Sequence, residues 1–275
     1  MNLGTLPALA LAATFVATDC RAETSEMIPV LGATTGKIQA LLETHIYRPT
    51  GAGPFPIAIL NHGSAGGDPK ATSKWEKDGV FLASRGYVVL APMRRGRGRS
   101  TGESPESEDK NCDEESWLSG LADSMRDIDA TIDFARTLPG AKPHDVLLLG
   151  VSRGGFLSVA YAAQGKYRSD VKGVVNFVGG WVANAEDQCP TDFNLTSFRK
   201  FGRLATVPML WLYGSGDSFY GDEAVTAYAS AFRTAGGRAT FYLIDGVPEN
   251  GHWLPSYRGK WEQYVSTFLR AHNAP

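Results

Sequence analysis

The chain of 275 residues has few cysteines, only three, and little net charge, and its apolar N-terminal stretch is too short to cross a membrane. The 27 Lys and Arg residues nearly balance 29 Asp and Glu residues, so we expect neither nucleic acid nor an anionic membrane as a partner. Internal repeats, low-complexity tracts and linkers between domains are absent as well. A hydrophobic content of 43% and a charged content of 20% are typical of a globular protein with a full core. We therefore expect one domain with no membrane span.

The sequence also lacks the motifs that hold common cofactors. Neither of its two glycine-rich turns, at residues 63–67 and 150–155, contains the Gly-Lys-Ser/Thr of a phosphate-binding loop. No His, Cys, Asp or Glu residues recur at the spacing of a metal site. We therefore expect a site that works without a metal ion or a cofactor.

The N-terminus differs from the rest of the chain. Residues 6–17 are apolar, and the small residues of Cys20-Arg21-Ala22 follow them. This pattern is typical of a secretory signal peptide cleaved after Ala22, although no Lys or Arg precedes the apolar stretch. A buried N-terminal helix is the alternative. We expect residues 1–22 to be a signal peptide, residues 23–275 to be the mature domain, and the protein to be exported to the periplasm or the medium.

Export would also decide whether the cysteines can form a disulfide bond. Cleavage after Ala22 would remove Cys20 and leave Cys112 and Cys189 in an oxidising compartment. An even pair in such a compartment predicts a disulfide bond between Cys112 and Cys189. Two unrelated thiols are the alternative.

Short apolar runs alternate with amphipathic segments along most of the chain. We expect strands at residues 38–47, 56–62, 87–92, 145–149, 171–178, 207–213 and 240–244, the first of them at a sheet edge. We expect helices at residues 71–84, 117–136, 156–163, 222–234 and 261–271, and a partly helical excursion over 182–204. This alternation predicts an α/β fold with a mostly parallel sheet and helices on both faces. In such sheets, functional residues follow strands rather than precede them.

The strongest functional signal is the pentapeptide Gly150-Val151-Ser152-Arg153-Gly154. It is a G-x-S-x-G motif between an apolar strand and a predicted helix, where it makes a tight elbow with the serine oxygen exposed. The two glycines are required because side chains at these positions would collide with the neighbouring strand and helix. We predict that Ser152 is a nucleophile.

A serine nucleophile needs a base that takes its proton and an acid that orients the base. Of the five histidines, His252 lies in the loop after the last predicted strand and comes after Ser152, whereas His272 lies in the C-terminal tail. His62 follows an early strand, and we predict that it holds its own loop. Asp217 directly follows the strand at 207–213. The order Ser152, Asp217, His252 is that of the α/β-hydrolases.

Two other acidic residues compete with Asp217. Asp222 and Glu223 lie close by in the sequence, but they suit the first turn of the helix at 222–234, where acidic side chains are favourable. We therefore predict Asp217 as the orienting acid.

The remaining parts of the site are predicted from the loops that follow strands. The amides of Ser64 and Arg153 are placed to bind the oxyanion of the transition state. The Arg153 side chain either attracts an acidic substrate or steadies the elbow helix through an ion pair. Trp181 and Trp253 are candidate walls of the substrate pocket.

Several of these motifs together resemble a known family. The chain from Pro56 onward is similar to the dienelactone hydrolase and prolyl-oligopeptidase-like branch of the α/β-hydrolase superfamily. The motifs that carry the resemblance are residues 59–67, 95–102, 150–154, 214–217 and 251–252. The resemblance implies an α/β-hydrolase fold with a small cap or none. It also implies that the basic run at 94–99 is a structural turn, with one arginine facing the substrate. Dienelactone enzymes use a cysteine nucleophile, and the serine at 152 departs from that pattern.

These observations predict an exported serine hydrolase that cleaves carboxylic esters through an acyl-enzyme on Ser152. The expected substrate is a small ester, or an ester in a peptide or polymer. A small serine peptidase or amidase is the alternative with the same chemistry. A catalytically silent binding protein on the same scaffold is the alternative from another class. The oligomeric state is left open by the sequence.

Overall fold

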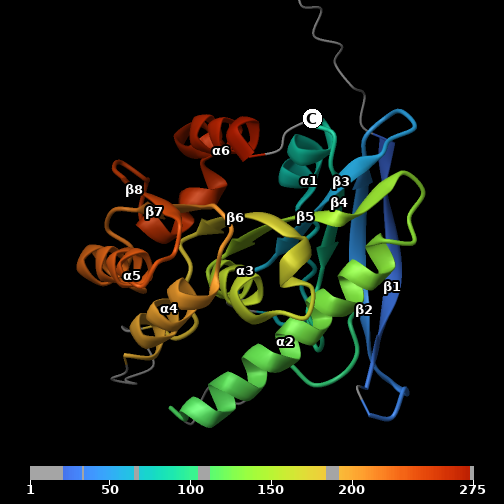
Figure 1. Ribbon diagram of the computed structural model, residues 1–275, viewed down its shortest axis with the longest axis horizontal. Helices are drawn as coiled ribbons and strands as arrows, with labels where there is room; N and C mark the ends of the chain where they lie inside the picture. The colour runs from blue at the N-terminus through green and yellow to red at the C-terminus, as the bar shows by residue number, and fades with distance from the viewer. Residues whose placement is uncertain (1–20, 33, 65–67, 105–111, 184–191, 273–275) are drawn as a thin grey trace, which may run out of the picture.

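A computed structural model of the chain describes residues 21–32, 34–64, 68–104, 112–183 and 192–272. Within these ranges eight strands form one sheet in the order β1-β2-β4-β3-β5-β6-β7-β8 (Figure 1). The strands are β1 (Arg21–Leu31), β2 (Ile38–Arg48), β3 (Phe55–Asn61), β4 (Val88–Pro92), β5 (Ala141–Val151), β6 (Val171–Phe177), β7 (Met209–Gly214) and β8 (Ala239–Ile244). β2 is antiparallel to both its neighbours, and the other pairs are parallel. The predicted mostly parallel sheet is confirmed.

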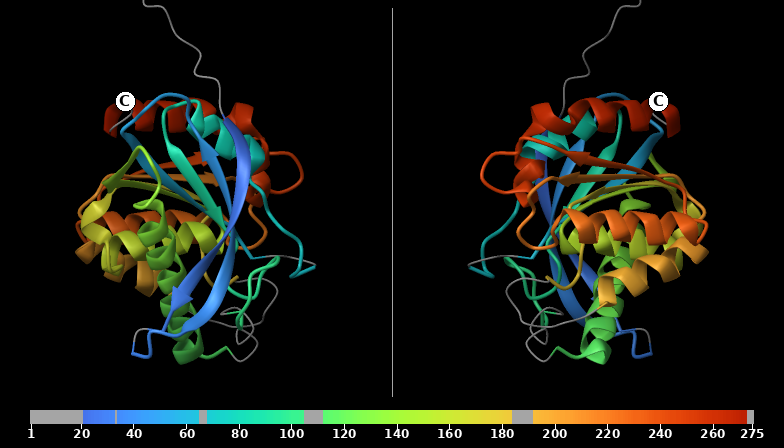
Figure 2. Two further views of the ribbon diagram at one scale, coloured as in Figure 1. Left: turned by 90° about the vertical axis from the view of Figure 1, so that its right-hand side faces the viewer. Right: turned by 90° about the vertical axis from the view of Figure 1, so that its left-hand side faces the viewer.

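Helices cover both faces of the sheet (Figures 1 and 2). α1 (Glu76–Ala83) and α6 (Arg258–His272) lie on one face. The other face carries α2 (Glu114–Ala135), α3 (Arg153–Gln164), α4 (Phe193–Leu204) and α5 (Asp222–Thr234). Because both faces are covered, all residues of β4 and β7 are buried, as expected for central parallel strands. Among the described helices, none has the length and apolarity needed to cross a bilayer.

An aromatic cluster seats α3 and α4 on the sheet. The Phe156 ring of α3 lies 5.0 Å from Phe198 and 5.5 Å from Phe201 of α4, between ring centroids. Trp211 of β7 lies 4.8 Å from Phe198 on the same measure. These phenylalanines recur at helical spacing, which is why residues 193–204 form a regular helix where the sequence predicted only a partly helical excursion. The cluster holds the helix that begins immediately after Ser152.

The sheet has one strand that the sequence analysis missed. β1 pairs with β2, so β2 is an internal strand and its predicted place at the edge is wrong. The period-two signal of β1 is short, because Ile28 and Val30 are buried while Met27 and Leu31 are exposed. β1 begins at Arg21, next to the expected cleavage point. Residues 1–20 lie outside the described part, so the signal peptide stays a prediction.

Two apolar side chains on the predicted helices are exposed, although an apolar residue of an amphipathic helix is expected to face the core. Val80 of α1 is 42% exposed and Leu118 of α2 is 43% exposed. Phe81 and Leu82, which follow Val80, are buried. Successive helical residues are turned by about 100°, so three apolar residues in a row cannot all face the sheet.

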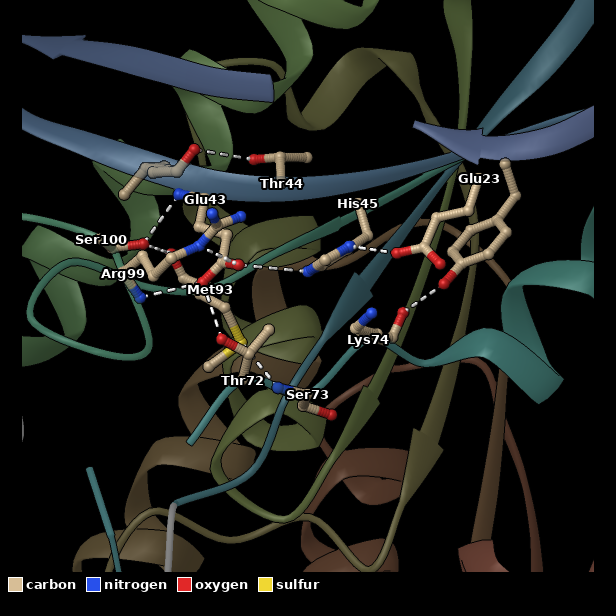
Figure 3. A network of polar contacts seen from close by, with 12 residues as sticks. Glu23, Glu43, Thr44, His45, Thr72, Ser73, Lys74, Met93, Arg99 and Ser100 are labelled. Atoms are coloured by element: carbon tan, nitrogen blue, oxygen red, sulfur yellow. Dashed lines mark hydrogen bonds and ion pairs between the residues drawn. The ribbon is translucent and has the colours of Figure 1, made fainter. Parts of the chain in front are cut away.

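A buried polar network ties β1, β2 and the turn after β4 together (Figure 3). The carboxylate of Glu43 on β2 is 2% exposed, and it accepts hydrogen bonds from the Thr72 hydroxyl at 2.8 Å and from the Arg99 amide at 2.9 Å. Arg99 Nε donates to the same carboxylate at 2.8 Å. His45 contacts Glu23 of β1 through Nδ1, and its Nε2 lies 3.5 Å from Glu43. Burial acts to raise the pKa of Glu43, but these hydrogen bonds and the Arg99 charge lower it overall.

The basic run after β4 is structural. Arg94 and Arg95 are both buried. Arg95 Nε and Nη2 donate to Oδ1 of Asp127 on α2 at 2.9 and 2.7 Å. A buried guanidinium paired in this way locks the turn against α2. The prediction of a structural turn is confirmed.

Candidate active site

Ser152 lies at the turn between β5 and α3, with φ 55° and ψ −123°. A Cβ on Gly150 would lie 2.0 Å from the Gly154 carbonyl oxygen, and one on Gly154 would lie 2.0 Å from the Asn61 carbonyl oxygen. Both contacts are far below van der Waals distance, so only glycine fits at these positions. The Ser152 amide donates to the Phe177 carbonyl at 2.9 Å and anchors the turn to β6. The strained elbow predicted from the sequence is present.

His252 and Asp217 meet at the carboxyl ends of β8 and β7. His252 Nδ1 lies 2.8 Å from Asp217 Oδ2, and both side chains are buried. Asp217 Oδ1 also accepts from the amide of Phe219 at 2.8 Å and of Tyr220 at 3.4 Å. A carboxylate that accepts all these bonds requires the proton on Nδ1 of the imidazole. His252 Nε2 is therefore the nitrogen that can accept a proton.

Asn250 joins the loops of His252 and Asp217, and the sequence analysis did not identify it. Its Oδ1 accepts from the His252 amide at 2.9 Å and from the Ser218 amide at 3.2 Å. Its Nδ2 donates to the Ser218 hydroxyl at 2.6 Å. Asn250 is the N-cap of the short 3-10 helix Gly251–Ser256, a position at which asparagine is favoured. That preference is the signal that could have found it.

The acidic rivals of Asp217 have other partners. Asp222 accepts from the Ser215 hydroxyl at 2.7 Å and from the Gly216 amide at 2.8 Å. Glu223 lies in the first turn of α5, as predicted. Asp217 is thus the acid that the fold brings to His252.

The loop after β3 lies beside Ser152. A Cβ on Gly63 would lie 3.1 Å from Ser152 Cβ. His62 Nε2 accepts from the Arg94 amide at 2.9 Å, so its Nδ1 donates to the Gly63 carbonyl at 2.6 Å. Arg94 Nη1 also donates to the His62 carbonyl at 2.5 Å. The prediction that His62 holds its own loop is confirmed.

A cavity of about 880 Å³ opens above these residues. Its lining includes Ser152 and His252 together with four other residues predicted for the site: Ser64, Arg153, Trp181 and Trp253. Asp217 lies behind His252 and is not part of the described lining. Trp181 is almost fully buried, whereas Trp253 is 44% exposed. The fold therefore brings to one cavity residues that are nearly 200 positions apart in the chain.

Charged and aromatic residues that the sequence analysis did not identify also line the cavity. They include Trp75, Lys77, Asp78, Phe219, Tyr220 and Arg258. Asp78 and Arg258 lie 3.6 Å apart at the α1 rim. Burial raises the pKa of Asp78, while the charge of Arg258 acts to lower it. Arg153 and Arg258 are the arginines of the described lining, and the arginines of the 94–99 run lie outside it.

Arg153 holds part of the cavity wall. Its Nε donates to the Trp181 carbonyl at 2.9 Å. This bond joins the first residue of α3 to the loop after β6. Arg153 is thus tied to the wall of the cavity as well as to the elbow.

Cys112 directly precedes α2, whereas Cys189 lies outside the described residues. The bond predicted between them stays a prediction.

Several solved structures of hydrolases have the same fold as this chain. A Klebsiella pneumoniae protein provisionally assigned as a dienelactone hydrolase is 19% identical, with a TM-score of 0.60 over 91% of this chain and 98% of its own. An esterase of Pyrococcus furiosus is 13% identical, with a TM-score of 0.63 over 90% and 91%. The acylaminoacyl peptidase of Pyrococcus horikoshii is 15% identical, with a TM-score of 0.66 over 92% of this chain and 42% of its own. The chain has the α/β-hydrolase fold.

Two sequence matches add to this. Residues 39–171 match the X-Pro dipeptidyl-peptidase (S15) family, a range that contains Ser152 but not Asp217 or His252. A Synechocystis protein provisionally assigned as a carboxymethylenebutenolidase is 29% identical over 116 residues, which are 41% of this chain and 45% of that protein. The match thus spans less than half of that relative. In fold and in part of its sequence, the chain is therefore similar to dienelactone hydrolases, esterases and prolyl-peptidase-like enzymes.

Proposed function

We propose that the protein is a serine hydrolase that cleaves carboxylic esters through an acyl-enzyme on Ser152. One observation carries the proposal: His252, which is paired with the buried Asp217, and Ser152 of the strained elbow line the same cavity. A buried carboxylate on one imidazole nitrogen leaves the other nitrogen free to act as a general base. A serine on an elbow is exposed to a carbonyl carbon that enters the cavity.

In this mechanism Ser152 Oγ attacks the carbonyl carbon while its proton passes to His252 Nε2. Asp217 stays ionised and stabilises the imidazolium that forms. The protonated Nε2 then returns the proton to the leaving alcohol, and an acyl-Ser152 ester remains. Water attacks this ester with His252 again as the base, and the acid is released.

The oxyanion of each tetrahedral intermediate needs preorganised donors. We assign this role to the amides of Ser64 and Arg153. Support comes from the close approach of the Gly63 loop to Ser152 and from the place of Arg153 at the start of α3. Trp181 and Trp253 are assigned to the walls that contact the acyl or alcohol part of the substrate.

A serine peptidase or amidase is the second candidate, and the family match over residues 39–171 favours it. Both candidates use the same acyl-enzyme chemistry, so the bond that is cleaved distinguishes them. We favour esters because the alcohol part of an ester is a better leaving group than the amine part of an amide, so an ester bond is cleaved more readily. A catalytically silent binding protein is a third candidate, and it would leave the Asp217–His252 pair without a purpose.

The test pairs p-nitrophenyl acyl esters with aminoacyl p-nitroanilides on the purified protein. We expect turnover of the esters, loss of that turnover in Ser152→Ala, and wild-type rates in the matched control Ser169→Ala, whose serine is exposed. Covalent labelling of the wild type, but not of Ser152→Ala, by a fluorophosphonate would exclude the silent binding protein. Faster turnover of the anilides would favour the peptidase, and ester turnover by Ser152→Ala would contradict the mechanism.

The proposal includes export after cleavage behind Ala22 and a disulfide bond between Cys112 and Cys189. Their support is the apolar stretch at residues 6–17 and the even pair of cysteines that cleavage would leave.

A further inference from the structure

Tyr220 lies in the loop between β7 and α5, three residues after Asp217. It is 6% exposed, and its amide bonds to Asp217 Oδ1. Its ring centroid lies 5.6 Å from the imidazole of His252. Tyr220 also lines the cavity that contains Ser152. A buried phenol therefore lies beside the two side chains that exchange the proton in the proposed reaction.

The ring of Tyr220 reaches from the end of β7 across the end of β6. A Cβ on Gly180 would lie 2.3 Å from Tyr220 Cζ and 2.7 Å from its hydroxyl oxygen. Gly180 itself lies next to the elbow, because its amide donates to the Ser152 carbonyl at 3.4 Å. The absence of a side chain at 180 is what lets the Tyr220 hydroxyl approach Ser152.

The Tyr220 hydroxyl lies near Ser152, because both residues contact Gly180. Burial raises the pKa of Tyr220, and the neighbouring Ser152 side chain acts to lower it without cancelling the increase. The phenol thus keeps its proton at neutral pH and can donate it in a hydrogen bond.

The direction of approach distinguishes this contact from the oxyanion site. In the sheet, β5 lies between β3 and β6. The Gly63 loop follows β3 and contacts Ser152 on one side, whereas Gly180 and Tyr220 follow β6 and β7 on the other. The Tyr220 hydroxyl is therefore on the side of His252, away from the amides assigned to the oxyanion.

We propose that Tyr220 is a positioning residue, whose hydroxyl donates to Ser152 Oγ and holds the nucleophile in the rotamer that directs its proton to His252. The inference rests on the proposed function of Ser152. A serine hydroxyl has one proton and two lone pairs. When Tyr220 occupies one lone pair, the proton of Ser152 points to His252 Nε2, and the second lone pair faces the carbonyl carbon.

This role predicts a specific kinetic signature. Tyr220 acts on free Ser152 Oγ, so it affects formation of the acyl-enzyme, whereas in the acyl-enzyme Oγ is already an ester oxygen. Loss of one neutral hydrogen bond from the transition state of acylation corresponds to about a tenfold decrease in the acylation rate. Acylation should slow by that factor, with KM and deacylation nearly unchanged.

The experiment compares Tyr220→Phe with the wild type in stopped-flow turnover of a p-nitrophenyl ester and in the rate of fluorophosphonate labelling. We expect the burst rate and the labelling rate to fall about tenfold and deacylation to stay within twofold. Tyr228→Phe is the matched control, because Tyr228 is also a buried tyrosine of this region but its hydroxyl accepts from Asn194 at 3.3 Å. It should label at the wild-type rate.

A second variant keeps the hydroxyl but displaces it. Gly180→Ala should push the Tyr220 ring away from Ser152 and slow labelling to a similar degree, and it decides the question if Tyr220→Phe fails to fold. Labelling at the wild-type rate in a folded Tyr220→Phe, or an equal loss in acylation and deacylation, would overturn the proposal. Ester turnover by Ser152→Ala would instead overturn the proposed function itself, so the two failures are distinguishable.

Discussion

At the scale of single residues, the hydrogen bond between Asp217 and His252 determines which imidazole nitrogen faces the cavity. The carboxylate accepts from Nδ1 at 2.8 Å and is itself held by two backbone amides. Asn250 then fixes the backbone of His252. The tautomer and the direction of the ring are therefore set before a substrate binds, which is the condition for general-base catalysis.

Replacement of this carboxylate by an amide should disable the base without disturbing the fold. In Asp217→Asn, an amide that donates to the ring favours the tautomer with the proton on Nε2, which cannot accept a proton from Ser152. We expect kcat for a p-nitrophenyl ester to fall on the order of 10⁴-fold, with KM much less affected. Steady-state kinetics measure both values.

Asp222→Asn is the control for this change, since Asp222 contacts Ser215 and Gly216 rather than His252. It should keep kcat within a few fold. Equal losses in the two variants would show that Asp217 only supports its loop.

At the scale of elements, β1 and β2 are joined to each other and to neighbouring loops by a network of polar contacts around the buried Glu43 (Figure 3). Glu43 connects β2 to Thr72 and to the turn that contains Arg99. His45 extends the network to Glu23 on β1. A buried carboxylate with these partners stabilises the fold only while it is ionised, because its neutral form loses the charged contacts.

Glu43→Gln should lower the free energy of unfolding at pH 7 by about 2 kcal/mol, because it removes a buried, hydrogen-bonded charge. The pKa of Glu43 is lowered in the folded state from its usual value of 4.5. Its contribution is therefore complete above pH 4.5 and is lost as pH falls through the lower folded-state pKa. Denaturant unfolding of both proteins between pH 7 and pH 3 should show the difference shrink below pH 4.5.

Glu26→Gln on β1 is the matched control, because Glu26 is exposed. It should change stability by less than about 0.5 kcal/mol at every pH. A difference between wild type and Glu43→Gln that stays constant down to pH 3 would contradict the assignment. Because Glu43 lies outside the described cavity lining, kcat should not change.

At the scale of the whole molecule, the parallel sheet gathers the site at one edge. Ser64, Ser152, Trp181, Asp217 and His252 follow β3, β5, β6, β7 and β8 respectively. Parallel strands present their carboxyl ends together, so residues from five separate loops meet in one cavity. Cys112 lies two residues before α2, and Cys189 lies outside the described residues.

The proposed disulfide bond should stabilise the exported protein as a whole. Closing the loop between Cys112 and Cys189 corresponds to roughly 4 kcal/mol on the chain-entropy model. We expect a reductant to lower the melting temperature of the exported protein, and mass spectrometry to find a chain that begins at residue 23 and lacks free thiols. Cys112→Ser should melt at the lower temperature with or without reductant. Equal melting of the wild type in both conditions would contradict the bond.

The local patterns of the sequence determined much of this protein. The elbow at Ser152 could be predicted because the glycines at 150 and 154 act within five residues of the serine. Burial on both sides made the central strands readable as apolar runs, and the end of one such run located Asp217. The position of His252 followed from the order of the chain together with its place in the loop after the last predicted strand.

Only the tertiary structure decided the parts that depend on distant partners. β1 has a short pattern and is defined by its pairing with β2. Arg94 supports His62, and Asn250 bridges two loops, through contacts made across the fold. Tyr220 packs against the backbone of Gly180, beside the Ser152 elbow, because residue 180, forty positions earlier, has no side chain. A sequence specifies such side chains by type, but their neighbours are set by the packing of separate elements, which no local pattern contains.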